Sequence, residues 1–155
     1  MPERILEKML VEDIMNLVAA DAAVLGPDDS ILSLLEAIIK DPRTRHVYVV
    51  DKSGVLIGSV RMNSVIRYLF PFTSFIVQRR HLGQRIPVDM SPSRVGDIMN
   101  SSPSCVQKGT TLVDAAAIMI QEQVNELPVV DEAMHVVGEV NMLEVITGYL
   151  KEEKE

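Results

Sequence analysis

The chain has 155 residues, of which 47% are hydrophobic and 24% charged, and its formal net charge at pH 7 is −7. Such a composition is typical of a globular domain with a sizeable core, and the acidic balance argues against nucleic acid as the main partner, because duplex binding needs basic side chains to neutralise phosphates. No stretch reaches the roughly 18 apolar residues of a membrane span, and the charged N-terminus lacks a signal-peptide core, so we expect a cytoplasmic protein without membrane insertion.

The first half of the chain predicts an alternation of strands and helices. It opens with the hexapeptide VEDIMN at Val11 and continues with a short strand around Leu25. Apolar residues at helical spacing then predict an amphipathic helix over 30–40, preceded by residues that can cap it. Two runs rich in β-branched residues, HVYVV and VLIGSV, flank a Ser-Gly turn and predict paired strands. A closing helix over 63–70 ends at Pro71.

The second half repeats this order. VGDIMN begins at Val95, a short strand surrounds Val106, a helix covers 111–121, two strands follow, and a last helix runs from Leu143 to about Glu153. The offset between matching segments drifts from 84 (95 − 11) through 81 (111 − 30) to 80 (126 − 46). Internal repetition of this kind indicates two copies of one structural unit. We expect a first repeat over 1–70, a connecting insertion over 71–94 and a second repeat over 95–155.

Each unit therefore reads β-α-β-β-α, which places the chain in the α/β (α+β) class. A unit of this size buries too little surface to be stable alone, because about 60 residues is already marginal for an isolated domain. Two units packed together and related by a pseudo-twofold axis would bury more. Such a pair also creates clefts between its halves, where ligands usually bind.

The repeated segments resemble the cystathionine-β-synthase (CBS) domain. The resemblance rests on DIMN, a capped helix, LPVVD and GEVNMLEVI, and it covers nearly the whole chain except the insertion; Tyr48 stands where the family favours proline. It implies a tandem pair that binds an adenosine-containing ligand such as AMP, ADP, ATP or S-adenosylmethionine in the cleft between repeats. It also implies a homodimer that regulates a separate enzyme or transporter, without catalysis of its own.

The family pattern places a hydroxyl after the Gly-hydrophobic-Val strand and an aspartate three positions later. The hydroxyl and the following helix start would hold a phosphate, and the carboxylate would accept hydrogen bonds from the ribose. The second repeat has Asn141 and Glu144 at these positions, which keeps a ribose and phosphate site plausible there. The first repeat has Arg61 and Ser64, so we expect its ribose contact to be weak or absent. Arg61 either grips phosphate or faces solvent.

Four apolar residues are further candidates for ligand contacts. By their place in the resemblance, Val106 and Leu127 in the second repeat, and Leu25 and Val47 in the first, could enclose a purine. For each of them burial for packing is the favoured alternative, because apolar residues of short central strands are mostly core.

Other functions have weaker support. A CBS-fold interaction module that has lost ligand binding is the main alternative, and the departures at Arg61 and Ser64 favour it. The sequence contains no P-loop, GxGxxG, HExxH or nucleophile elbow, so we expect no enzyme and no catalytic residue. Cys105 is the single cysteine, and no Cys/His spacing suits zinc, so no metal is expected either. The apolar half of the insertion 72–94 suggests a contact surface.

Overall fold

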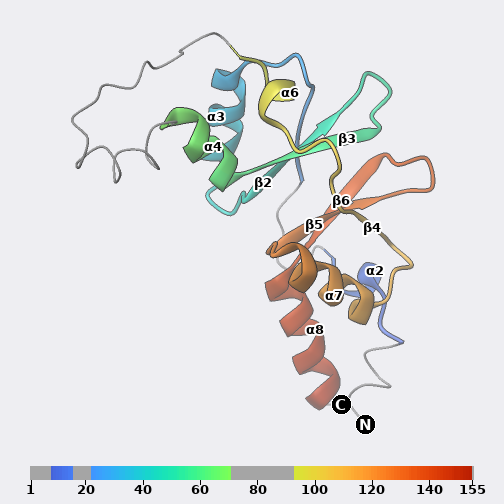
Figure 1. Ribbon diagram of the computed structural model, residues 1–155. Coiled ribbons are helices and arrows are strands. Elements are labelled where there is room, and N and C mark those ends of the chain that lie inside the picture. The colour runs from blue at the N-terminus through green and yellow to red at the C-terminus, as the bar shows by residue number, and fades with distance from the viewer. Residues whose placement is uncertain (1–7, 16–21, 71–92, 155) are drawn as a thin grey trace, which may run out of the picture.

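The computed structural model describes residues 8–15, 22–70 and 93–154 (Figure 1). The first repeat contains β1 (Ala23–Leu25), α3 (Ile31–Lys40), β2 (His46–Val50), β3 (Leu56–Arg61) and α4 (Met62–Leu69). The second contains β4 (Val106–Gln107), α7 (Leu112–Glu122), β5 (Glu126–Val130), β6 (Val136–Asn141) and α8 (Met142–Lys154). Two one-turn helices, α2 (Val11–Ile14) and α6 (Val95–Ile98), lie in the two hexapeptides. The predicted mixed fold with two β-α-β-β-α units is confirmed.

The two sheets have the same topology. Their strand orders are β1-β2-β3 and β4-β5-β6, with a parallel first pair and an antiparallel second pair in each. Even the irregularity in the antiparallel register recurs, between Val49 and Val50 in one sheet and between Val129 and Val130 in the other. A shared irregularity of this kind supports the interpretation that one unit occurs twice.

The long helix of each repeat begins at a side-chain cap. The hydroxyl of Ser30 accepts a hydrogen bond of 3.1 Å from the backbone N–H of Ser33 at the start of α3. Thr111 caps α7 in the same way, accepting from the N–H of Asp114 at 3.2 Å. These caps satisfy backbone donors that the first helical turn leaves without a partner. The predicted helix starts therefore have the expected chemistry.

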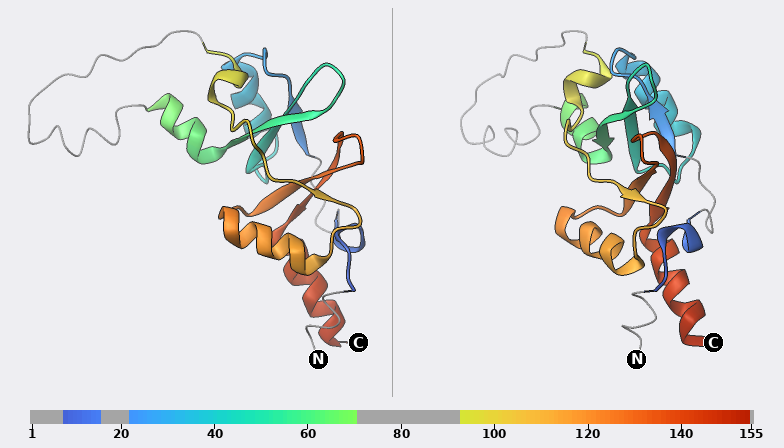
Figure 2. Two further views of the ribbon diagram at one scale, coloured as in Figure 1. Left: turned by 45° about the vertical axis from the view of Figure 1, so that its right-hand side comes forward. Right: turned by 90° about the vertical axis from the view of Figure 1, so that its right-hand side faces the viewer.

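The opening hexapeptides are exchanged between the repeats. Val11 and Ile14, in α2, are fully buried in the core of the second repeat, whereas Val95, in α6, is buried in the core of the first. Figure 2 shows α2 beside α7 and α8, and α6 beside α3 and α4. In space, therefore, each hexapeptide lies against the repeat that does not contain it in sequence.

Backbone hydrogen bonds hold the exchanged segments in place. The N–H of Val11 donates to the carbonyl of Thr110 at 2.8 Å, and the N–H of Val95 donates to the carbonyl of Asp29 at 2.9 Å. The aspartate of each hexapeptide accepts from the N–H of the residue just before that hexapeptide: Asp13 from Leu10 at 2.9 Å, and Asp97 from Arg94 at 2.8 Å. The repeated aspartate thus closes the short turn that presents the apolar side chains to the other repeat.

Glycines in the paired strands make room for the exchanged methionines. A Cβ at Gly58 would collide with the side chain of Met99, and a Cβ at Gly138 would collide with the side chain of Met15. Because these contacts are equivalent in the two repeats, the Gly-hydrophobic-Val pattern and the DIM pattern fit each other across the molecule.

The two sheets also meet through their hairpins. Tyr48, Leu56 and Val130 form a buried cluster to which both repeats contribute. Nearby, the N–H of Leu56 donates to the carbonyl of Met134 at 2.9 Å. We call the boundary between the repeats, where these contacts lie, the seam. The expected contact surface in the insertion 72–94 lies outside the described residues except at its last two positions.

Replacing Ile14 by alanine should lower the free energy of unfolding by about 2–5 kcal/mol, the range for removing a buried isoleucine side chain. Because Ile14 packs in the other repeat's core, amide hydrogen exchange should rise in α7 and β5. Ile39→Ala is the matched control, since Ile39 is 78% exposed and should change stability by at most about 0.5 kcal/mol. Faster exchange confined to α3 and β2 would contradict the exchanged packing.

Candidate functional site

Two clefts lie along the seam at equivalent positions of the pseudo-twofold arrangement. The first cleft follows β2, β3 and the start of α4, and consists of two cavities that share Ser59, Arg61 and Asn100. Its inner cavity holds only about 20 Å³ and its outer one about 210 Å³. The second cleft, of about 310 Å³, is lined by residues of both repeats: Arg43, Arg45, Asn125, Glu126, Glu139, Asn141, Met142 and Leu143.

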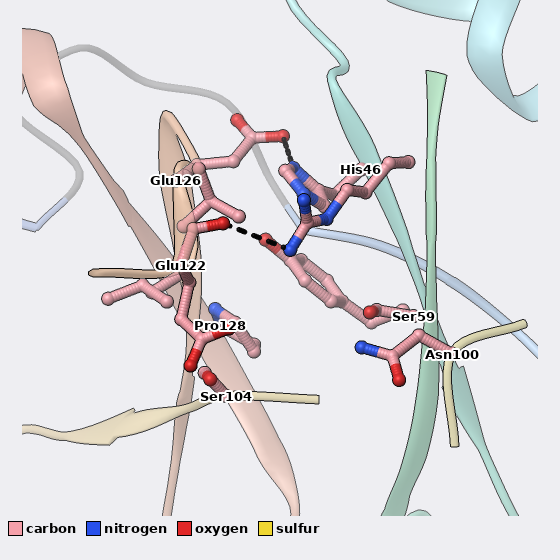
Figure 3. Close-up of a pocket in the computed structure, with 11 residues that line it drawn as sticks. His46, Ser59, Asn100, Ser104, Glu122, Glu126 and Pro128 are labelled. Carbon is pink, nitrogen blue, oxygen red and sulfur yellow. Dashed lines mark hydrogen bonds and ion pairs between the residues drawn. The ribbon is translucent and has the colours of Figure 1, made fainter. Parts of the chain in front are cut away.

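Two buried polar pairs cross the seam between the clefts. The hydroxyl of Tyr48 donates to Oε2 of Glu139 at 2.6 Å. Nδ1 of His46 lies 2.9 Å from Oε1 of Glu126, which also accepts from the backbone N–H of Arg45 at 3.1 Å. Figure 3 shows Glu126 and His46 pointing toward each other at the inner cavity. All four side chains are buried. Each polar group therefore bonds to its partner across the seam instead of to water.

The carboxyl group of Glu139 holds its proton at neutral pH. Burial is the main cause and raises its pKa to about 8, helped by the nearby charge of Glu126. Burial likewise raises the pKa of Tyr48 well above its ordinary value. A protonated Glu139 can accept from Tyr48 with one oxygen and donate with the other, which keeps two neighbouring carboxyl groups from repelling each other.

The start of α8 is closed by its own side chains. Oδ1 of Asn141 accepts from the N–H of Glu144 at 2.8 Å, and Oε1 of Glu144 accepts from the N–H of Asn141 at 3.1 Å. This reciprocal arrangement is a capping box, and it leaves Glu144 only 2% exposed. The residue expected to accept hydrogen bonds from a ribose is thus buried against its own helix, because the longer glutamate stem folds back. Asn141 does line the second cleft.

The start of α4 is different. Its N-cap residue, Arg61, makes no side-chain capping bond; the guanidinium donates instead to the carbonyl of Glu122 at 3.3 Å, across the seam (Figure 3). Arg61 and Ser64 both line the outer cavity of the first cleft. The structure therefore brings together the two first-repeat residues that the family pattern singles out.

The apolar candidates are spread over several places. Leu127 is 2% exposed and lines the inner cavity. Val47 is packed in the core of the first repeat and Val106 in that of the second, which agrees with the alternative of burial for packing. Leu25 lines a further cavity beside α3, which shares Arg43 with the second cleft. Contact of any of these residues with a ligand stays a prediction.

The polar pairs of the seam were not predicted from the sequence. One signal was available, because Tyr48 occupies a position where the resembling family has proline. A second was Glu139, a charged residue inside the apolar strand β6. Neither signal names a partner, since only the packing of one repeat on the other brings Tyr48 to Glu139.

Other chemistry finds no support in the described part of the chain. Within 8–15, 22–70 and 93–154 no three His, Cys, Asp or Glu side chains gather as a metal site. Burial raises the pKa of the Cys105 thiol, which favours the unreactive protonated form. Among the helices described, none has the length and apolar character needed to cross a bilayer.

Comparison with known proteins agrees with this architecture. The family model of the CBS domain matches residues 11–71 and 95–151. The chain therefore belongs to the CBS domain family and contains a tandem pair of these domains. CBSX1 of Arabidopsis thaliana, a chloroplastic CBS domain-containing protein, is 24% identical over 143 residues; the match covers 84% of this chain but only 60% of CBSX1.

Solved structures share the fold. A CBS domain-containing protein from Thermotoga maritima is 29% identical, with a TM-score of 0.75 over 92% of this chain and 95% of that one. CBSX2 in complex with AMP is 23% identical, with a TM-score of 0.70 over 94% of this chain and 98% of that one. Further matches are the MJ0100 CBS pair with 5′-methylthioadenosine and S-adenosyl-L-methionine, and the cytosolic domain of the Mg²⁺ channel MgtE with ATP.

Glu139→Gln should reduce the pH dependence of stability. In the wild type the folded state keeps a proton up to about pH 8, whereas the unfolded chain releases it near its ordinary value of 4.5. Stability should therefore fall as pH rises between these values and level off above pH 8. The loss is roughly 2–5 kcal/mol. Glutamine cannot ionise but keeps an oxygen for Tyr48, so most of this loss should disappear.

Denaturant unfolding at pH 5.5, 7 and 9 measures this effect. Glu132→Gln, at an exposed turn position, is the matched control and should follow the wild-type pH profile. Equal pH profiles for the wild type and Glu139→Gln would show that Glu139 ionises normally in the folded protein.

Proposed function

We propose that this chain is a regulatory module that senses adenosine-containing ligands. AMP, ADP, ATP or S-adenosylmethionine would bind in the clefts along the seam, and a separate enzyme or transporter would respond. The observation that carries the proposal is that both clefts have walls from both repeats. A ligand in either cleft would contact both halves at once.

The seam provides a physical route from binding to signalling. A ligand that fits one arrangement of the repeats better than another shifts the population toward it, by no more than its difference in affinity for the two. The cross-repeat bonds of Tyr48 and His46 are the contacts such a shift would strain. CBSX2 with AMP offers a precedent of the same fold with an adenosine ligand.

A CBS-fold interaction module without a ligand is the second candidate. The observation that favours it is the self-capped start of α8, where Asn141 and Glu144 occupy each other's hydrogen-bonding groups. The tight Tyr48–Glu139 bond also fills space at the seam. Neither proposal includes catalysis, and a cytoplasmic location remains the prediction made from the sequence.

A second copy of the chain is the partner we propose for the helical face of the second repeat. An open groove of about 540 Å³ between α7 and α8 is lined by apolar side chains alone apart from the tyrosine hydroxyl: Leu112, Val113, Ala116, Ala117, Ile120, Val145, Ile146 and Tyr149. Ile120 is 74% exposed and Ile146 is 61% exposed. Apolar side chains gathered in one patch are typical of a protein–protein contact, and burying them against the same face of another copy gives a twofold dimer.

Ligand binding should raise thermal stability. A ligand at about 100 times its dissociation constant adds about 2.7 kcal/mol to the free energy of unfolding. Thermal unfolding with ATP, ADP, AMP and S-adenosylmethionine should show an upward shift for at least one of them, with guanosine and methionine as controls. If none of the four ligands shifts the transition at millimolar concentration, the ligand-free interaction module is the correct function.

Charge placed in the groove should prevent dimer formation. Ile120→Glu and Ile146→Glu each put a carboxylate where the second copy would pack, and an unpaired buried charge is costly. Light scattering coupled to size exclusion should give a dimer for the wild type and a monomer for each variant. Ile39→Glu, on α3 of the first repeat and also highly exposed, is the matched control for this face. A monomeric wild type would refute the proposed dimer.

A further inference from the structure

The two repeats present opposite chemistry at equivalent helix starts. At α8 the capping box of Asn141 and Glu144 occupies the first backbone donors and buries a carboxylate there. At α4 no side chain caps the helix. The free N–H groups of a helix start, together with its dipole, attract anions. This difference alone would make α4 the better end for a negatively charged group.

A buried hydroxyl in β3, three residues before α4 begins, points to the same conclusion. Ser59 is only 7% exposed and lines both cavities of the first cleft, and Figure 3 shows it facing the inner cavity. Its backbone is paired with Asn100, at 3.0 and 2.8 Å, but its side-chain hydroxyl has no hydrogen-bond partner among residues 8–15, 22–70 and 93–154. A buried hydroxyl without a partner is unfavourable, and a bound oxygen would satisfy it.

The outer cavity beside this hydroxyl is lined by basic or neutral residues, whereas Glu122 and Glu126 line the inner one. We call the outer cavity of the first cleft the α4 seat; it is lined by Ser59, Arg61, Asn63, Ser64, Arg67 and Asn100. None of these lining residues carries a carboxylate, although the whole chain has a net charge of −7. The second cleft also has two arginines, Arg43 and Arg45, but its wall includes the buried carboxyl groups of Glu126 and Glu139. Arg43 is already paired with Asp41, at 3.0 Å, so the α4 seat, with two arginines and no carboxylate in its lining, attracts a phosphate group more strongly than the second cleft does.

We propose that the α4 seat binds the phosphate chain of a ligand without hydrogen bonds to its ribose hydroxyls, an inference that rests on the proposed nucleotide-sensing function. Two guanidinium groups and the hydroxyl of Ser59 would hold the phosphates. Ser64, at the position where the family pattern has a carboxylate, offers no anionic acceptor for a ribose. Affinity then depends on the number of phosphates more than on the sugar, and it is the first repeat that carries the occupied site.

Isothermal titration at constant ionic strength tests this inference with ATP, 2′-deoxy-ATP, adenosine and inorganic tripolyphosphate. ATP and 2′-deoxy-ATP should bind within about threefold of each other, because no charged hydrogen bond to the ribose is lost. Tripolyphosphate should bind and compete with ATP, whereas adenosine should bind at least tenfold more weakly than ATP.

Variants then assign the site. Arg61→Gln and Arg67→Gln should each weaken ATP at least tenfold, the effect of losing one charged hydrogen bond. Arg94→Gln is the matched control, since Arg94 is exposed and lines neither cleft. Ser59→Ala should weaken ATP several-fold while leaving thermal stability equal or higher, because the orphaned hydroxyl is removed. Lower stability of Ser59→Ala with unchanged affinity would assign Ser59 a purely structural role and count against the seat.

The outcomes separate this inference from the proposed function. If ATP binds but 2′-deoxy-ATP binds more than tenfold more weakly, the protein bonds to the ribose hydroxyl. The inference is then wrong, while the proposed sensing function survives. The inference is also wrong if ATP affinity is unchanged in Arg61→Gln and Arg67→Gln but lost in Arg45→Gln, at the second cleft. If tripolyphosphate binds through Arg61 and no nucleoside phosphate does, the seat stands and nucleotide sensing fails. If no probe binds, both fail.

Discussion

The exchange of the two opening hexapeptides is the constraint on which the rest of the structure depends. Val11 and Ile14 complete the core of the second repeat, and Val95 completes that of the first. Neither core is therefore whole without the other repeat, and small units of this size have little stability to spare. Because each half supplies an apolar segment to its neighbour, the two sheets are held face to face, and clefts arise between them.

The seam between these sheets combines an apolar cluster with two buried polar pairs. Tyr48 bonds Glu139 and His46 bonds Glu126, both pairs joining one repeat to the other. Pairs of this kind add little net stability, because desolvation offsets much of what the bonds contribute. They do set the relative position of the repeats, since any shift would leave buried carboxyl groups without partners. The boundary between the repeats therefore tolerates few arrangements.

The sequence was sufficient to predict the repeat, the order of strands and helices, and the side-chain caps. All of these depend on residues that are close together in the chain. Ser30 and Thr111 cap their helices through hydrogen bonds to residues only three positions later in the chain. The exchange could not be predicted in the same way: both hexapeptides have the same pattern, so nothing local shows which core each one joins. Glu144 posed a related difficulty, since a carboxylate at the family's ribose position can also turn back on its own helix.

The two helix starts show how duplicated units can diverge through a few side chains. At α8 a glutamate is long enough to reach its own backbone, and with Asn141 it forms a closed cap. At α4 the same two positions hold Arg61 and Ser64; the arginine extends across the seam to the carbonyl of Glu122 instead of capping the helix. Backbone donors that one repeat satisfies with its own side chains are therefore left uncapped by side chains in the other. The fold thus fixes where the two helix starts lie, and the residues at those two positions determine whether each start is capped by its own side chains.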